Sequence, residues 1–194
     1  GSATDPGPRG APGTAQLVAR LQTAGRYFVV VSHDSGAEDP AADRKNPYLL
    51  SAVLASDPDL NEPNDQAPTA VTLPACGATS VEGALSTEGD VDRFSFDLTP
   101  CAGRTLLHLT VDGPASEAAL RLAYSLEGPA GTVAIDHAAN PYAAQHVATA
   151  RLVTAGRYTL TVQGYQAPGE LRAPPGDPAF TYQAKLSLLP DADS

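Results

Sequence analysis

Short runs of alternating apolar and polar residues recur along most of the chain. The clearest of them lie at about residues 94–98, 107–111, 120–126, 158–162 and 182–188. Because side chains of a β-strand point alternately to its two faces, each run predicts a strand with one apolar and one polar face. Such strands are typical of two antiparallel sheets packed face to face. The pattern therefore predicts an all-β fold, a jelly-roll-like antiparallel β-sandwich over about residues 59–194.

Part of this pattern occurs twice. Residues 19–27 recur as residues 150–158 with a difference at one position, and residues 48–54 align with residues 182–188. The two copies are separated by about the length of a whole sandwich, which indicates a repeated domain. We expect three segments, namely a linker or tag at 1–13, a partial C-terminal half-copy forming a β-hairpin unit at 14–58, and a complete copy at 59–194.

The partial copy carries apolar residues on both faces. The positions that are polar in the complete copy but apolar here are Phe28, Val30, Leu49 and Val53. An isolated hairpin is marginally stable in water, and exposed apolar patches of this kind are typical of interaction surfaces. We expect these four residues to form an interface that is covered by the following sandwich, by a second chain, or by upstream strands.

Oxygen-bearing side chains gather in two short stretches of the complete copy. Glu62, Asn64 and Asp65 surround a proline, and Asp90 and Asp92 stand at the entrance to a predicted strand. Such oxygen atoms suit a hard cation such as calcium, which takes six to eight of them. The alternative is that they are solvated turn residues, since Asp and Asn favour turns. Two further carboxylates, Asp57 and Asp59, lie just upstream and are possible additional ligands.

Three motifs occur in a fixed order. They are Glu-Pro-Asn-Asp at 62–65, Gly-Asp-Val-Asp-Arg-Phe at 89–94 and Ala-Gly-Arg-Tyr at 155–158. In this combination the chain, over about residues 59–190, resembles the bacterial pre-peptidase C-terminal domain family, known also from the collagen-binding modules of secreted collagenases. The resemblance implies a calcium ion where the entering linker folds back onto an early strand, with Glu62, Asn64, Asp65, Asp90 and Asp92 as its ligands.

The resemblance also bears on the two cysteines, Cys76 and Cys101, which flank two predicted strands. Members of the family are extracellular, which favours a disulfide, and the alternative is a pair of small buried thiols. A bridge would close a loop of roughly two dozen residues and stabilise the fold by about 3 kcal/mol. The family's collagen-binding modules bind through tyrosines, which makes the two loop tyrosines Tyr142 and Tyr165 candidate ligand-binding residues, whereas Tyr124 and Tyr182 alternate into the core.

Charge and motif content exclude several function classes. A formal net charge of -10 argues against nucleic acid or an anionic membrane as partner, and no apolar run is long enough to cross a bilayer. The four histidines fit no metalloprotease pattern, and no Gly-x-Ser-x-Gly nucleophile motif is present. We therefore expect a protein that is not an enzyme.

These observations lead to a ranked set of functions. The first is a non-catalytic accessory module of a secreted or cell-surface bacterial protein, stabilised by calcium and contacting a protein or matrix ligand. The second is a surface assembly protein built from repeats, which self-associates through the apolar hairpin. The third is a glycan-acting enzyme, which would need two carboxylates facing each other across a cleft.

Overall fold

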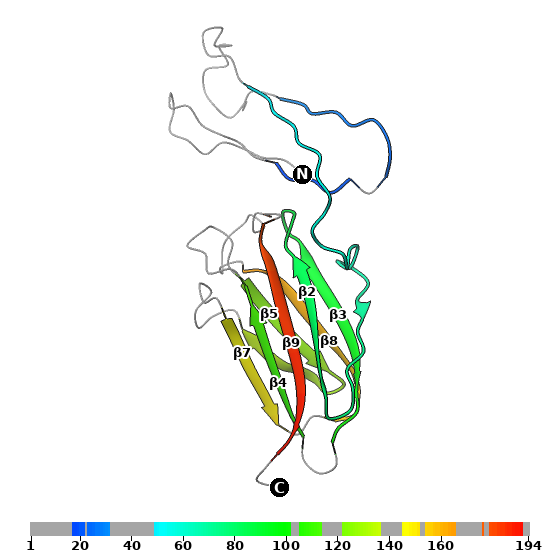
Figure 1. The fold of residues 1–194 in the computed structure, drawn as a ribbon, viewed down its shortest axis with the longest axis vertical. Coiled ribbons are helices and arrows are strands. Elements are labelled where there is room, and N and C mark those ends of the chain that lie inside the picture. Colours follow the sequence, from blue (N-terminus) through cyan, green and yellow to red (C-terminus); the bar gives the residue numbers. More distant parts are fainter. Residues whose placement is uncertain are drawn as a thin grey trace. The chain divides into compact units, whose positions relative to one another are not determined.

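The structure is a computed structural model. It describes residues 17–21, 23–31, 49–101, 105–113, 122–136, 145–151, 154–165, 176 and 179–191. These residues form two β-sheets and no helix (Figure 1). No helical segment with the length and hydrophobicity needed to cross a bilayer occurs among them.

The strands of the described residues all belong to one of two compact units, which comprises Gly1–Ala19 and Asp57–Ser194. Their bounds are β1 (Thr69–Ala70), β2 (Ala78–Ala84), β3 (Val91–Leu98), β4 (Thr105–Asp112), β5 (Leu122–Gly128), β6 (Gly131–Asp136), β7 (Gln145–Arg151), β8 (Gly156–Gly164) and β9 (Thr181–Pro190).

One sheet has the strand order β1-β3-β8-β5-β6 and the other has the order β2-β9-β4-β7. Every pairing is antiparallel except the short parallel contact between β1 and β3. Figure 1 shows β2, β9, β4 and β7 lying over β3, β8 and β5. The predicted all-β sandwich is confirmed, while the jelly-roll-like connectivity stays a prediction.

The core lies between the two sheets and follows the alternation of the sequence. In β3 the side chains of Phe94, Phe96 and Leu98 are at most 2% exposed, and their polar neighbours point away. Matching inward residues come from β4, β5, β8 and β9, and Phe96 stacks on Tyr158 with ring centroids 5.8 Å apart. Each such side chain contributes roughly 1.5–3 kcal/mol when it is removed from water, so this interior is the main source of stability.

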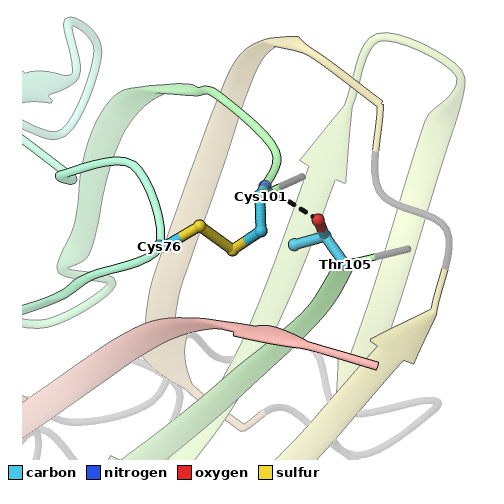
Figure 2. Close-up of a disulfide and its surroundings, with 3 residues drawn as sticks. All are labelled: Cys76, Cys101 and Thr105. Atoms are coloured by element: carbon cyan, nitrogen blue, oxygen red, sulfur yellow. Dashed lines mark hydrogen bonds between the residues drawn. A yellow bond between two sulfur atoms is a disulfide. The ribbon is translucent and has the colours of Figure 1, made fainter. Parts of the chain in front are cut away.

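A disulfide joins the two sheets at one end of the sandwich. Cys76 precedes β2 and Cys101 follows β3, and because these strands belong to different sheets the bond links one sheet to the other (Figure 2). Their Cα atoms are 5.1 Å apart, and the backbone N–H of Cys101 donates to the hydroxyl of Thr105 at 2.9 Å. The predicted disulfide is confirmed, and the alternative of two free thiols is wrong.

Residues Arg20–Ser56 form the other compact unit. Its described residues contain no strand, so no β-hairpin is formed among them. The topology of the sandwich gives the reason, because the counterparts of the two repeated segments are β8 and β9, which lie in different sheets and do not pair. The four predicted interface residues are strongly exposed, from 79% for Phe28 to 92% for Leu49. That this unit is a partial repeat stays a prediction, and residues 1–13 lie outside the described residues.

Candidate metal centre

The linker that enters the sandwich is folded by its own side chains. The carboxylates of Asp57, Asp59 and Glu62 each accept a hydrogen bond from a backbone N–H two residues later, at 3.0, 2.7 and 3.1 Å respectively. Asp and Asn favour this local arrangement over strand or helix, because the short side chain mimics a backbone acceptor. The linker therefore curls instead of running straight into β1.

Two carboxylates fasten the curled linker to the strands. Asp59 accepts a hydrogen bond from the backbone N–H of Ala84 at the end of β2, at 2.9 Å. Asp65 accepts one from the N–H of Val91 at the start of β3, at 3.2 Å. These contacts span 25 and 26 residues of sequence, so they place the linker at the same edge of the sandwich as the entrance to β3.

The turn before β3 orients Asp90. Gly89 has a φ of 72°, a left-handed conformation that favours glycine, and it reverses the chain just ahead of the strand. One carboxylate oxygen of Asp90 accepts hydrogen bonds from the backbone N–H groups of Ser86 and Thr87, at 2.7 and 3.1 Å. Asp90 is 5% exposed, so this carboxylate is held by the turn in a buried position.

Asp92 is the most buried carboxylate of the site, with no exposed surface. It lies on the same face of β3 as Phe94, and its Oδ2 atom accepts a hydrogen bond from the hydroxyl of Tyr182 at 2.6 Å. Its Oδ1 atom has no hydrogen-bond partner within the described part of the chain. Gly83, opposite Tyr182 on β2, leaves room for this pair, since an added Cβ would lie 2.8 Å from Oδ2.

The electrostatics of the site follow from this burial. The pKa of Asp92 is raised to about 8, chiefly by loss of solvent; the hydrogen bond from Tyr182 opposes the rise, and the negative charges of Asp59, Asp90 and Glu62 add to it. Burial, together with the charge of Asp92, raises the pKa of the Tyr182 phenol. Without a cation, the site therefore disfavours the ionised form of its central carboxylate.

The carboxylates converge in two overlapping groups. Oxygen atoms of Asp59, Glu62 and Asp92 lie within 4.8 Å of one another, and so do those of Glu62, Asp65 and Asp90. Glu62 belongs to both groups and joins them. Four of the five predicted metal ligands, Glu62, Asp65, Asp90 and Asp92, therefore belong to these two groups.

The fifth predicted ligand, Asn64, lies between Glu62 and Asp65 in the linker. Its side chain is completely buried, and neither its amide oxygen nor its amide nitrogen has a hydrogen-bond partner among the described residues. A buried amide without partners is costly, by about 1–3 kcal/mol, so its oxygen needs a donor or a cation that the described residues do not supply.

The arrangement fits a hard divalent cation. Two oxygens bound to one calcium ion at about 2.4 Å cannot be more than about 4.8 Å apart, and each group meets that limit. All donors in both groups are oxygen atoms, which calcium prefers over the nitrogen and sulfur ligands typical of zinc. A cation would also offset the repulsion that raises the pKa of Asp92.

Asp59 was not one of the five predicted ligands, although it was named as a possible additional one. The sequence carried a signal for it, the alternating oxygen-bearing residues Asp57, Asp59 and Asn61, but nothing in that run indicates a contact with β2. The role of Tyr182 was also not predicted. Its burial was expected, whereas its hydrogen bond to Asp92 depends on the pairing of β9 with β2, which the sequence does not state.

The other predicted site residues lie elsewhere. Tyr165 follows directly after β8 and is half-buried, and Tyr142 lies outside the described residues. Tyr124 and Tyr182 are core residues as expected, at 2% and 3% exposure. His108 lies on β4 and is half-buried on the face away from the core.

Comparison with known proteins finds similarity at low sequence identity. The chain matches no protein-family model and no curated protein. One similar solved structure is the pre-peptidase C-terminal domain of a collagenase from Bacillus anthracis, with 16% identity, 64% of this chain and 99% of that chain covered, and a TM-score of 0.39. Another is PliG of Aeromonas hydrophila, a periplasmic inhibitor of g-type lysozyme, with 16% identity, 62% and 96% coverage, and a TM-score of 0.35. At these values the similarity assigns no function to this chain.

Proposed function

We propose that the chain is a non-catalytic accessory module of a secreted or cell-surface bacterial protein, that calcium stabilises it where the linker meets β3, and that it mediates protein or matrix contacts. The observation that carries the proposal is the convergence of carboxylates from two distant stretches of sequence in two groups that share Glu62. Five carboxylates, those of Asp59, Glu62, Asp65, Asp90 and Asp92, repel one another unless a cation or protons intervene.

A stabilising role for the ion follows from where its ligands come from. Asp59, Glu62 and Asp65 belong to the linker, while Asp90 and Asp92 belong to the turn and strand that the linker touches. An ion bound to both sets would hold the linker against the sandwich, and anything that binds only the folded state raises its stability. The ion in this proposal shapes a scaffold and takes no part in a reaction.

The location outside the cytoplasm is supported by the disulfide between Cys76 and Cys101. Disulfides persist in oxidising compartments and are rare in the cytosol. Extracellular modules typically bind calcium with dissociation constants of about 10⁻⁴–10⁻³ M, so a calcium site also suits this location. Both features fit a module that works outside the cell.

Calcium titration tests the proposal directly. The chain is freed of metal with EDTA and dialysed, and its melting is followed by circular dichroism with and without calcium at about 100 times the dissociation constant. Binding should stabilise the sandwich by about 2.7 kcal/mol, which corresponds to a rise in Tm of roughly 5–15 °C for a domain of this size. Isothermal titration calorimetry gives the dissociation constant independently.

A matched pair of variants locates the ion. Asp90→Asn removes a carboxylate of the proposed site, while Asp97→Asn makes the same change at an exposed position of β3, where the carboxylate pairs with Arg157 at 3.1 Å. Asp90→Asn should lose most of the rise in Tm that calcium causes, and Asp97→Asn should keep it. If both variants keep the full rise in Tm, or the parent chain shows none at about 100 mM calcium, which is roughly 100 times the weakest dissociation constant expected, the proposal is wrong.

A further inference from the structure

Gly176, in the connection between β8 and β9, lies directly against the backbone of Thr87. A Cβ atom added at Gly176 would overlap the N, Cα and carbonyl C atoms of Thr87. Backbone atoms cannot bend aside as the end of a long side chain can, so the position has room for a glycine and for no larger residue. Because Thr87 lies between β2 and β3, this contact joins two connections that are far apart in the sequence.

Thr87 is the central residue of the turn that holds Asp90. Its backbone N–H donates to Asp90 Oδ2 at 3.1 Å, and its carbonyl oxygen accepts a hydrogen bond from the N–H of Asp90, also at 3.1 Å. The N–H of Ser86, which is 3% exposed, donates to the same Oδ2 atom at 2.7 Å. The position of the Thr87 backbone therefore sets the direction of both donors that orient the Asp90 carboxylate.

The segment that carries Gly176 is fastened close to this turn. Phe180, which follows shortly after Gly176, is 6% exposed in the core, and its carbonyl oxygen accepts a hydrogen bond from the N–H of Leu85 at 3.1 Å. Leu85 comes just before the turn, so Gly176 and Thr87 are both held near the end of β2. An added side chain at Gly176 has to displace the turn, because the anchor at Phe180 limits how far its own segment can move.

The direction of the Asp90 carboxylate matters because other carboxylates lie close to it. Oxygen atoms of Glu62, Asp65 and Asp90 lie within 4.8 Å of one another, so their negative charges repel one another in the metal-free chain. Hydrogen bonds from backbone N–H groups offset this repulsion and keep the Asp90 carboxylate in place. Groups that orient a metal ligand without touching the metal typically change the affinity about 10–100-fold when they are lost.

We propose that Gly176 is a positioning residue of the calcium site, which acts by fixing the backbone of Thr87 and through it the Asp90 carboxylate. The inference rests on the proposed function, because it concerns the same ion. It adds a third segment to the site, the connection between β8 and β9, beside the linker and the turn before β3. The coupling is reciprocal, so calcium also strengthens the packing of Gly176 on Thr87.

Two glycine-to-alanine variants test this near the site and away from it. Gly176→Ala introduces a methyl group that overlaps Thr87, while Gly128→Ala introduces one that overlaps the ring of Tyr158. Tyr158 pairs with Phe96 in the second half of β3, whereas the turn precedes the first residue of that strand. Both variants should have a lower Tm in EDTA than the parent chain. By isothermal titration calorimetry, Gly176→Ala should raise the calcium dissociation constant at least about 10-fold, and Gly128→Ala by about twofold or less, since changes at distant sites are independent.

A metal-free measurement separates positioning from general destabilisation. In EDTA, amide hydrogen exchange followed by NMR should be at least about 10-fold faster for Ser86 and Thr87 in Gly176→Ala than in the parent chain, after scaling by the amide of Leu109. Leu109 lies in β4 and reports opening of the sandwich as a whole. In Gly128→Ala the scaled exchange rates should match those of the parent.

The parent chain alone gives a second measurement, which decides the matter even if Gly176→Ala does not fold. In a calcium titration followed by nitrogen–proton correlation NMR, the amide resonances of Thr87 and Gly176 should shift together with one dissociation constant. The resonance of Gly128, at the other end of the sandwich, should not move.

The outcomes distinguish this inference from the proposed function. A parent chain that binds no calcium overturns both. If the parent binds calcium, the inference alone is overturned when Gly176→Ala keeps the parent's dissociation constant, when its scaled Ser86 and Thr87 exchange is unchanged, or when Gly176 does not shift while Thr87 titrates. Equal weakening of calcium binding in Gly176→Ala and Gly128→Ala also overturns it, because the effect would then be general destabilisation.

Discussion

Replacing Asp92 by asparagine should have opposite effects with and without calcium. Asn keeps the shape of the side chain and an oxygen that can accept the hydrogen bond from Tyr182, but it removes a carboxyl group that is completely buried. In the metal-free protein this removes a buried group that must either stay protonated or carry an unfavourable charge. In the calcium-bound protein it removes a ligand.

The size of the first effect follows from the pKa of Asp92, which is about 8 in the folded chain against 3.8 for an unperturbed carboxyl. Because the folded pKa is the higher one, this group stabilises the fold fully below about pH 4 and loses that contribution as the pH rises through about 8. At pH 7 the loss amounts to about 4 kcal/mol at 1.36 kcal/mol for each pH unit. Local relaxation reduces the figure, so we expect Asp92→Asn to stabilise the metal-free chain by about 2–4 kcal/mol.

Urea denaturation followed by circular dichroism measures this directly, in EDTA and in calcium, at pH 5.5 and pH 8.5. In EDTA the parent chain should be less stable at pH 8.5 than at pH 5.5, and Asp92→Asn should reduce that difference. Asp59, Glu62 and Asp90 face Asp92 and their charges contribute to its raised pKa, so part of the pH dependence should remain. In calcium the parent chain should be more stable than Asp92→Asn, the reverse of the order expected in EDTA.

The reasoning is refuted if Asp92→Asn destabilises the metal-free chain at pH 8.5, or if the variant gains as much stability from calcium as the parent. Asp97→Asn is the matched control, since Asp97 lies on the same strand but is exposed beside Arg157. It should leave both the pH dependence and the calcium response unchanged.

Three further changes test the packing. Gly83→Ala should destabilise the chain by about 1–3 kcal/mol and weaken its calcium response, because the added methyl displaces the Tyr182 hydroxyl from its carboxylate partner. Cys101→Ser should cost about 3 kcal/mol, measured in urea against the parent with and without reductant, because the closed loop of 25 residues is released. Leu160→Ala should cost about 2–5 kcal/mol by the same assay, because Leu160 is completely buried.

Each of these has a clear contrary outcome. An unchanged calcium response in Gly83→Ala would mean that the Tyr182 hydrogen bond does not support the site. Equal stability of parent and Cys101→Ser under oxidising conditions would mean that the bridge does not constrain the unfolded chain. A Leu160→Ala variant as stable as Val29→Ala, which changes the exposed counterpart, would contradict the assignment of the core.

Much of the sandwich could be predicted from the sequence because each of its strands has one apolar face and one polar face. The alternation that placed Phe94 and Phe96 inward also placed Asp92 inward, two positions earlier on the same face. Because Asp92 shares the inward face of β3 with Phe94, its carboxylate is buried at the start of the strand and not solvated. The same argument applied to the partial copy, where an apolar residue at every position indicated a strand that needs cover on both faces.

The remaining features depend on pairings that the local sequence does not encode. The hydrogen bond from Ala84 to Asp59 joins residues 25 positions apart, and the contact between Tyr182 and Asp92 joins residues 90 apart. A hairpin seemed natural for residues 27–54 because the two apolar runs are consecutive, yet β8 and β9 belong to different sheets. The order of the strands in the two sheets, and not the β-propensity of each segment, therefore determines which distant residues are in contact.

Anomalous diffraction from crystals of the full chain grown with calcium tests the central claim most directly. The account predicts a calcium peak about 2.3–2.6 Å from oxygens of Glu62 and Asp90 or Asp92, at the place where the linker meets β3. Crystals that diffract well but show no anomalous peak between these carboxylates, or that show calcium bound only elsewhere on the surface, would contradict it.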